Sequence, residues 1–162
     1  MIILDNQQVT NKIRRIAYQI AEVYMDHDAI VLAGIMDGGH SFARLLKAEL
    51  DRINMFETLL CEVHVDKKNP RAAISTSITA AQYENKGVVL CDDVLNSGTT
   101  LVYAVRHFLD VPLTKFKTAV LVNRNHKKYP VKADFKGISL STTLQEHVQV
   151  DLKKDNYSVS LQ

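Results

Sequence analysis

Val88–Leu101 reads VVLCDDVLNSGTTL, and it carries the clearest structural signal in the chain. An apolar strand, VVLC, runs directly into two acids, Asp92 and Asp93, and the polar run Asn96–Thr100 and an apolar helix follow. A short strand that is apolar throughout is typical of a parallel sheet covered on both faces. In such sheets, ligands bind where a strand ends and the next helix begins. The stretch therefore predicts an α/β domain with its ligand site at this turn.

The turn has the composition of a phosphate-binding loop. Gly98 allows backbone conformations that side chains disfavour and lets a ligand approach the chain closely. The helix that follows directs its first backbone N–H groups and the positive end of its dipole toward the same point. Ser97, Thr99 and Thr100 add hydroxyl donors. No lysine follows the glycine, so the turn differs from a Walker loop and is predicted to cradle a phosphate dianion.

Asp92 and Asp93 need partners of their own. Adjacent carboxylates at the end of a buried strand are costly unless cations or hydroxyl donors satisfy them. A ribose diol and a bound magnesium ion would supply both. The alternative is that the acids cap a helix and that the turn is purely structural, which explains the parts but not their combination.

Strand and helix alternate through most of the remaining chain. The polar stretch Asp66–Lys86 has no clear period and is expected to be a functional loop. The tail after Asn123 is expected to form short strands and turns. This order predicts a central parallel sheet flanked by helices. Strands are predicted at 2–4, 29–34, 57–65, 88–91 and 116–122, and helices at 9–23, 42–53 and 98–109.

The composition is that of a single soluble domain covering residues 1–162. Hydrophobic residues make up 46% and charged residues 23%, and the net charge of +2 gives no general reason to expect nucleic acid. Cys61 and Cys91 lie in apolar runs and are predicted to be buried free thiols. With no apolar run near the roughly 20 residues of a membrane span and no signal-peptide pattern, we expect a cytoplasmic protein without membrane contact.

Residues 88–101 match the 5-phosphoribosyl-1-pyrophosphate (PRPP) signature of the type I phosphoribosyltransferases. The chain most resembles the PyrR family, which comprises bifunctional pyrimidine-operon attenuation regulators and uracil phosphoribosyltransferases. Residues 2–5, 31–35, 119–126 and 129–137 carry that resemblance beyond the PRPP loop. The implied fold is a type I phosphoribosyltransferase-like α/β domain with a small C-terminal segment that covers the base. A homodimer that uses PRPP and a nucleobase is also implied.

The resemblance implies a role for each part of the predicted site. Asp92 and Asp93 would hold the ribose hydroxyls of PRPP and, with Asn96, form the catalytic set. A mobile lid would span Asp66–Gln82. The further residues are Asn96, Ser97, Gly98, Thr99 and Thr100 around the 5′-phosphate; Met36, Asp37, Gly38 and Gly39 in the pyrophosphate loop; Lys67, Lys68 and Arg71 in the lid; and Asn123, Arg124 and Ile138 near the base.

The implied chemistry is displacement of pyrophosphate at the anomeric carbon by a nitrogen of the base. Its transition state resembles an oxocarbenium ion, so the protein must neutralise the leaving pyrophosphate and exclude water. Magnesium is the expected cofactor, carried mainly by PRPP rather than by a dedicated protein site. The lid cations would add positive charge on closure.

The nucleobase is the open part of this interpretation. Asn96 stands where purine-using relatives commonly carry an aspartate, and an amide cannot act as a base at neutral pH, which favours a pyrimidine such as uracil. A transferase for a purine or another base is one alternative. Departures from the PyrR pattern support another: Asp37 replaces basic residues, Thr99 an arginine and Ser141 a proline.

That second alternative is a regulator that senses nucleotides and binds RNA, with weak or no catalysis. A basic patch would have to carry the RNA, and the low net charge favours ordinary solvated side chains instead. The cations available for such a patch are Arg14, Arg15, Arg124, Lys127, Lys128 and Lys132.

Overall fold

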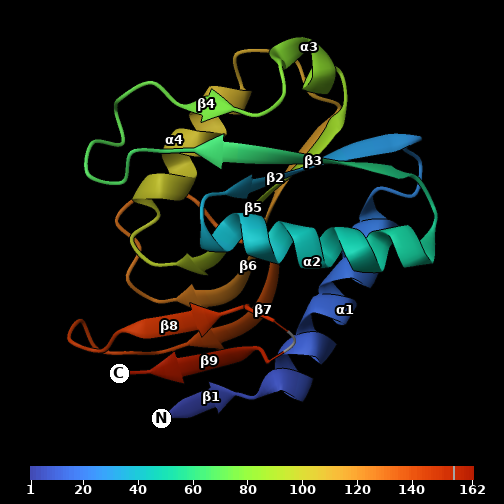
Figure 1. The fold of residues 1–162 in the computed structure, drawn as a ribbon. Helices are drawn as coiled ribbons and strands as arrows, with labels where there is room; N and C mark the ends of the chain where they lie inside the picture. Colours follow the sequence, from blue (N-terminus) through green and yellow to red (C-terminus); the bar gives the residue numbers. More distant parts are fainter. Residues whose placement is uncertain (155) are drawn as a thin grey trace.

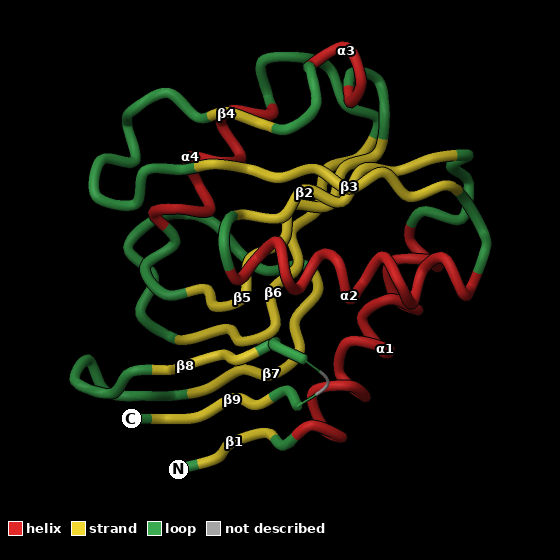
Figure 2. The backbone as a smooth tube through the Cα atoms, in the orientation of Figure 1, coloured by secondary structure: helices red, strands yellow, loops and turns green. Residues whose placement is uncertain are grey.

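The computed structural model describes residues 1–154 and 156–162, and the strands in these ranges form two sheets (Figures 1 and 2). The larger sheet has six strands in the order β4-β3-β2-β5-β6-β7, and the smaller has three in the order β1-β9-β8. The elements are β1 (Ile2–Leu4), α1 (Asn6–Val23), β2 (Ala29–Ile35), α2 (Gly38–Ile53), β3 (Glu57–His64), β4 (Ser75–Thr76), α3 (Ala80–Tyr83), β5 (Gly87–Leu95), α4 (Thr99–Phe108), β6 (Lys115–Arg124), β7 (Phe135–Leu140), β8 (Val148–Asp151) and β9 (Ser158–Leu161).

The predicted parallel sheet is confirmed. Strands β3, β2, β5, β6 and β7 pair in parallel, and only the short β4 runs antiparallel, against β3. The central strand β5 is longer than the predicted Val88–Cys91, because its pairing with β6 continues from Asp92↔Val120 to Leu95↔Asn123. Both acids of the predicted site therefore belong to the strand itself.

Side chains alternate across the sheet and build a core on each face. On β2, Ile30 and Leu32 pack in the core formed with α1 and α2, while Val31 and Ala33 join the core formed with α4. Figure 1 shows α1 and α2 together beside the sheet. The run Ala29–Ile35 is apolar throughout because both of its faces are covered.

The helices begin where the sequence supplies a start. Asp5 caps α1 by accepting a hydrogen bond from the Gln8 amide at 2.9 Å, and the Gln8 side chain accepts one in return from the Asp5 amide. Gly38 and Gly39 form the first turn of α2 rather than a break before it. No helix in the described ranges is long and apolar enough to cross a membrane.

The stretch Asp66–Lys86 is more ordered than its composition suggested. Its second half forms β4 and α3, and Thr79 and Gln82 make a capping box at the start of α3. Tyr83 is buried, and its ring centroid lies 4.9 Å from that of Phe108 on α4. The sequence predicted a functional loop here and no regular elements, and it missed this short helix because a single buried aromatic ring holds it in place.

The tail forms the small second sheet together with the N-terminus. β9 pairs antiparallel with both β1 and β8, so the two ends of the chain lie side by side (Figure 1). Leu4, Val148 and Val159 are buried in the core that α1 and α2 cover. This packing brings β8 close to β5 and so to the predicted site.

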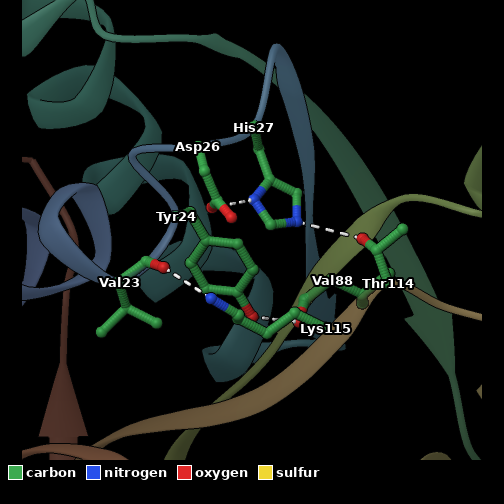
Figure 3. A network of polar contacts seen from close by, with 7 residues as sticks. All are labelled: Val23, Tyr24, Asp26, His27, Val88, Thr114 and Lys115. Atoms are coloured by element: carbon green, nitrogen blue, oxygen red, sulfur yellow. Dashed lines mark hydrogen bonds and ion pairs between the residues drawn. The ribbon is translucent and has the colours of Figure 1, made fainter.

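A polar network holds the end of α1 against the amino ends of β5 and β6 (Figure 3). The hydroxyl of Tyr24 donates to the carbonyl of Val88 at 2.9 Å, and Lys115 Nζ donates to the carbonyl of Val23 at 2.8 Å. His27 contacts Asp26 through Nδ1 and Thr114 through Nε2. Burial raises the pKa of Tyr24 above its ordinary value, so its hydroxyl stays protonated and able to donate.

Tyr24→Phe is expected to lower the free energy of unfolding by about 1–2 kcal/mol, because the buried carbonyl of Val88 loses a donor. Tyr18→Phe, an exposed position on the same helix, is the matched control and should change it by less than about 0.5 kcal/mol. Urea titration measures both. Equal values for the two variants would contradict the structural role assigned to the Tyr24 hydroxyl.

Candidate active site

The end of β5, the loop after it and the start of α4 surround one side of a cavity of about 380 Å³. The cavity lies at the carboxyl edge of the parallel sheet, where ligand sites of α/β proteins are found. Part of β8 and one lysine of the 66–82 segment line its other side. The lining residues are Lys67, Asp92–Leu101 and His147–Val150.

The loop requires glycine at position 98. The backbone φ of Gly98 is +86°, in the left-handed region that side chains rarely adopt. A Cβ there would also lie 2.6 Å from Cγ1 of Val131, which packs behind the loop. The carbonyl of Ser97 accepts hydrogen bonds from the amides of Lys128 and Tyr129, at 2.7 and 3.3 Å. The loop is therefore held from behind and leaves its other side to the cavity.

The donors of the predicted anion cradle line the same cavity. Gly98 is the N-cap of α4 and supplies no side-chain cap, while the amide of Thr99, the first of the helix, donates to Ser97 Oγ at 3.3 Å. Ser97 Oγ and Thr99 Oγ1 lie 2.9 Å apart, and Thr100 lines the same cavity. Backbone amides, hydroxyl groups and the helix dipole thus converge on one point, as an anion site requires.

Asp92 and Asp93 lie beside the cradle with one oxygen each held by the backbone. Asp92 Oδ1 accepts from the amide of Asp93 at 2.9 Å, and Asp93 Oδ1 accepts from the amide of Val94 at 2.8 Å. Burial, and next the negative charge of Asp93, raise the pKa of Asp92 well above its ordinary value. Lys67 acts in the opposite direction and lowers it. The acids therefore suit a ligand that brings cations or hydroxyl groups.

The predicted pyrophosphate loop lies directly against these acids. A Cβ on Gly38 would collide with the carboxylate of Asp93, and one on Gly39 would lie 2.5 Å from the carbonyl of Cys91. The two glycines thus allow the loop to approach the end of β5. Asp37, Gly38 and Asp93 line a second cavity of about 260 Å³, together with Ser41 and residues 149–153. Met36 precedes them through a cis peptide bond.

The structure separates the three predicted lid cations. Lys67 lines the main cavity, whereas the amide of Lys68 donates to Asp66 Oδ1 in a turn. Arg71 lines a different cavity of about 190 Å³, beside Arg106 and His107 of α4. Only Lys67 of the three is thus placed to meet a ligand of the phosphate loop in this conformation.

None of the residues predicted near the base lines the main cavity, although Arg124 donates a hydrogen bond to Asn96 of the phosphate loop. Asn123 and Arg124 line a separate cavity of about 350 Å³, and Asn123 Nδ2 donates to Ser139 Oγ at 3.3 Å. Ile138 packs against the core under α1 and α2. The main cavity is bordered instead by His147–Val150, which the sequence reasoning missed. The alternation of Val148 and Val150 with polar residues signals a strand, but nothing in it signals a site.

The six cations considered for a basic patch are largely engaged elsewhere. Arg14 pairs with Glu49 at 3.6 Å, and Arg15 donates to the carbonyl of Gly137 at 2.8 Å. Arg124 is buried. Lys132 Nζ lies 3.7 Å from Asp134 Oδ1. The two remaining cations of the six, Lys127 and Lys128, are exposed.

A dedicated metal site is not found in the described ranges, where no group of three or more His, Cys, Asp or Glu side chains could hold an ion. The residues nevertheless fit magnesium that arrives with a phosphate ligand. Mg²⁺ is commonly bound by one or two carboxylates plus substrate phosphates. Asp92 and Asp93 offer Oδ2 atoms that take no part in the backbone hydrogen bonds described above.

The sheet, the loop and its position define the chain as an α/β protein with a phosphate loop at the carboxyl edge of a parallel sheet. The chain belongs to the phosphoribosyltransferase family, because the model of the phosphoribosyl transferase domain matches residues 2–155. This confirms the family and the fold class expected from the sequence. Both cysteines are free and buried, also as predicted.

Individual relatives agree with this assignment. The chain is 31% identical over 160 residues to "Bifunctional protein PyrR" of Actinobacillus pleuropneumoniae serotype 5b (strain L20), covering 92% of this chain and 88% of that protein. It is 29% identical to the protein of that name from Bacillus cereus (strain B4264), covering 94% of this chain and 91% of that protein.

Solved structures agree in fold. The hypoxanthine phosphoribosyltransferase of Trypanosoma cruzi superposes with a TM-score of 0.80 at 18% identity, covering 98% of this chain and 95% of that one. A hypoxanthine-guanine phosphoribosyltransferase of Bacillus anthracis gives 0.72 at 19%, over 86% and 82%. These two structures support the fold.

Asp92→Asn is expected to stabilise the protein more at pH 7 than at pH 4. The raised pKa means that the folded protein holds the Asp92 proton more tightly than the unfolded chain does. Its stabilising contribution is complete below the unfolded pKa of roughly 3.9 and is lost as pH rises through the folded pKa. An asparagine at this position cannot ionise, so the variant avoids this loss of stability at pH 7. Urea titrations should therefore give a larger gain in the free energy of unfolding at pH 7 than at pH 4. Asp110→Asn, at an exposed position, is the control; the same shift in both variants would contradict this assignment.

Proposed function

We propose that this protein transfers the ribose 5-phosphate of PRPP to a nucleobase, uracil in the first place, and releases pyrophosphate. One observation carries the proposal: a single cavity brings together an anion cradle, two carboxylates and a lysine, with room of about 380 Å³. The family and the fold support pentosyl transfer in general. The position of each ligand group follows from the chemistry of the lining residues.

The 5′-phosphate would lie on the cradle of Ser97–Thr100, where amide and hydroxyl donors converge. The ribose hydroxyls would donate to the buried Asp92 and the half-buried Asp93, which gain the partners that carboxylates out of contact with bulk water need. The pyrophosphate would extend toward Met36–Gly39, because the second cavity adjoins Asp93. Lys67 would then face the phosphate groups from the lid.

In the proposed reaction a nitrogen of the base bonds to the anomeric carbon while the bond from that carbon to pyrophosphate oxygen breaks. The electron pair of the broken bond leaves with pyrophosphate, and the base loses its proton to solvent or to a neighbouring group. Positive charge develops on the ribose ring, which the nearby carboxylates of Asp92 and Asp93 would stabilise. Lys67 would offset the negative charge of the leaving group.

Magnesium fits this arrangement as a partner of PRPP. When bound, it would neutralise phosphate charge and so favour departure of pyrophosphate. Three acids, Asp37, Asp93 and Asp151, and one cation, Lys153, line the cavity beside the pyrophosphate loop, so a phosphate without a counter-ion would be repelled there. An acidic loop in place of the basic one of PyrR proteins is thus compatible with a ligand that carries its own cation.

The base would lie between Asn96 and the wall formed by His147–Val150. Uracil is proposed because the chain resembles PyrR proteins over most of its length, and because Asn96 carries an amide where purine enzymes carry a carboxylate. A purine substrate is the second candidate, since the solved structures of similar fold are named hypoxanthine phosphoribosyltransferases. Their identity of 18–19% speaks to the fold rather than to the base.

The direct test mixes the protein with PRPP, magnesium and one base at a time and follows pyrophosphate release. The bases are uracil, orotate, hypoxanthine, guanine and adenine. We expect release with uracil. Release with a purine alone would correct the proposed base, and no release with any of the five would contradict the proposed reaction and favour a nucleotide-sensing regulator.

Lys67→Ala is expected to lower kcat/KM for PRPP by roughly tenfold, because one charge next to the phosphate groups is lost. Lys68→Ala is the matched control, since it removes an adjacent lysine that does not line the cavity. That variant should stay within about twofold of the original enzyme. An equal loss in both variants would show that the charge of the segment matters but not the placement of Lys67.

A further inference from the structure

We propose that Arg124 is a positioning residue that fixes the side-chain amide of Asn96 so that its NH₂ group faces the base. Asn96 then offers the base a hydrogen-bond donor and no acceptor. The substrate must present an acceptor at this wall, either a carbonyl oxygen or a ring nitrogen without a proton. This inference rests on the proposed function, because it names the recognition chemistry of the same cavity.

Arg124 is buried, with 7% of its surface exposed, and its guanidinium joins two separate parts of the chain. Nη1 donates to Asn96 Oδ1 at 2.9 Å, which reaches the loop after β5. Nε and Nη2 donate to Thr142 Oγ1 at 2.9 and 2.8 Å, and Nη2 also donates to the carbonyls of Thr143 and Glu146. A buried cation is held in one geometry when it has this many partners.

The direction of the Asn96 amide follows from the chemistry of arginine. A guanidinium has five N–H donors and no acceptor, so the atom of Asn96 that faces Arg124 must be the oxygen. The NH₂ group occupies the other branch of the carboxamide, away from Arg124. Arg124 and Asn96 line different cavities, with Asn96 in the cavity of the phosphate loop. The free branch therefore belongs to the side on which the base would lie.

The same guanidinium also sets the opposite wall of the cavity. Thr142, Thr143 and Glu146 precede His147–Val150, which line the cavity across from the loop. Arg124 thus links the residue that would read the base to the segment that would cover it. A substitution at position 124 is expected to affect recognition of the base, while the phosphate cradle is held independently by Lys128 and Tyr129.

The test compares ligands that contain a base with one that lacks it. Isothermal titration calorimetry would measure binding of uridine, inosine and guanosine 5′-monophosphates and of ribose 5-phosphate. The variants are Arg124→Gln, Asn96→Ala and the double variant, with Arg15→Gln as the control. Arg15 also donates to main-chain carbonyls, Lys136 and Gly137, but lines neither cavity.

In each single variant we expect the affinity for the nucleotide that the original protein binds best to fall by roughly tenfold. Affinity for ribose 5-phosphate should stay within about twofold, and Arg15→Gln should change neither ligand. The double variant should bind the nucleotide about as weakly as the singles, because both changes remove the same oriented donor. The proposal would be overturned if the loss of nucleotide affinity in the double variant equalled the product of the two single losses. It would also be overturned if ribose 5-phosphate lost as much affinity as the nucleotide, or if the original protein bound none of the three nucleotides.

Asn96→Asp provides a second test that does not disturb Arg124, should Arg124→Gln fail to fold. One carboxylate oxygen can accept from Arg124 while the other replaces the NH₂ group, so the donor becomes an acceptor. The added negative charge weakens any phosphate ligand to some extent, so we expect the nucleotide to lose at least tenfold more affinity than ribose 5-phosphate does. Unchanged nucleotide affinity would overturn the inference. Pyrophosphate release by the original protein tests the proposed function separately. If the Arg124 and Asn96 variants behave as expected but no pyrophosphate is released, the proposed function is refuted and the role of Arg124 in nucleotide binding still holds.

Discussion

Two neighbouring carboxylates at the end of the central strand are the constraint on which the rest of this site depends. Asp92 is almost fully buried, and burial together with the charge of Asp93 raises its pKa. The strand stays in register with β6 past both acids, so neither can turn out into solvent by local fraying. The surroundings follow from this: Gly38 and Gly39 leave space for the carboxylates, and Lys67 faces them across the cavity.

Such an arrangement costs stability in the free protein and is useful only when a ligand completes it. The phosphate cradle and the acids suit a ligand that joins a phosphate, hydroxyl groups and a cation-bound leaving group. PRPP with magnesium has these three parts, in agreement with the family assignment. The stabilising contacts lie elsewhere, in the two cores and in the polar network of Tyr24 at the opposite edge of the sheet.

The sequence predicted the parts of the fold whose signal is local. The apolar runs of β2 and β5, the helical spacing of α1 and the glycine of the phosphate loop each reflect a requirement within a few residues. Pairing partners of the short tail strands could not be inferred this way, because β9 is held by β1 from the other end of the chain. The same reason hid His147–Val150 from the predicted site. Arg124 was predicted beside the base, but its contacts with Asn96 and Thr142 join residues far apart in the sequence, so no local pattern could predict them.

PRPP binding at Val88–Leu101 is best tested by direct titration. Calorimetric titration of PRPP with magnesium would compare the original protein with the double variant Asp93→Asn, Thr100→Ala, whose folding is checked by circular dichroism and thermal unfolding. Loss of a carboxylate and a hydroxyl from the same site should reduce PRPP affinity by roughly a hundredfold or more, with the fold intact. Unchanged affinity in a folded double variant would show that PRPP binds elsewhere or that this loop serves another ligand.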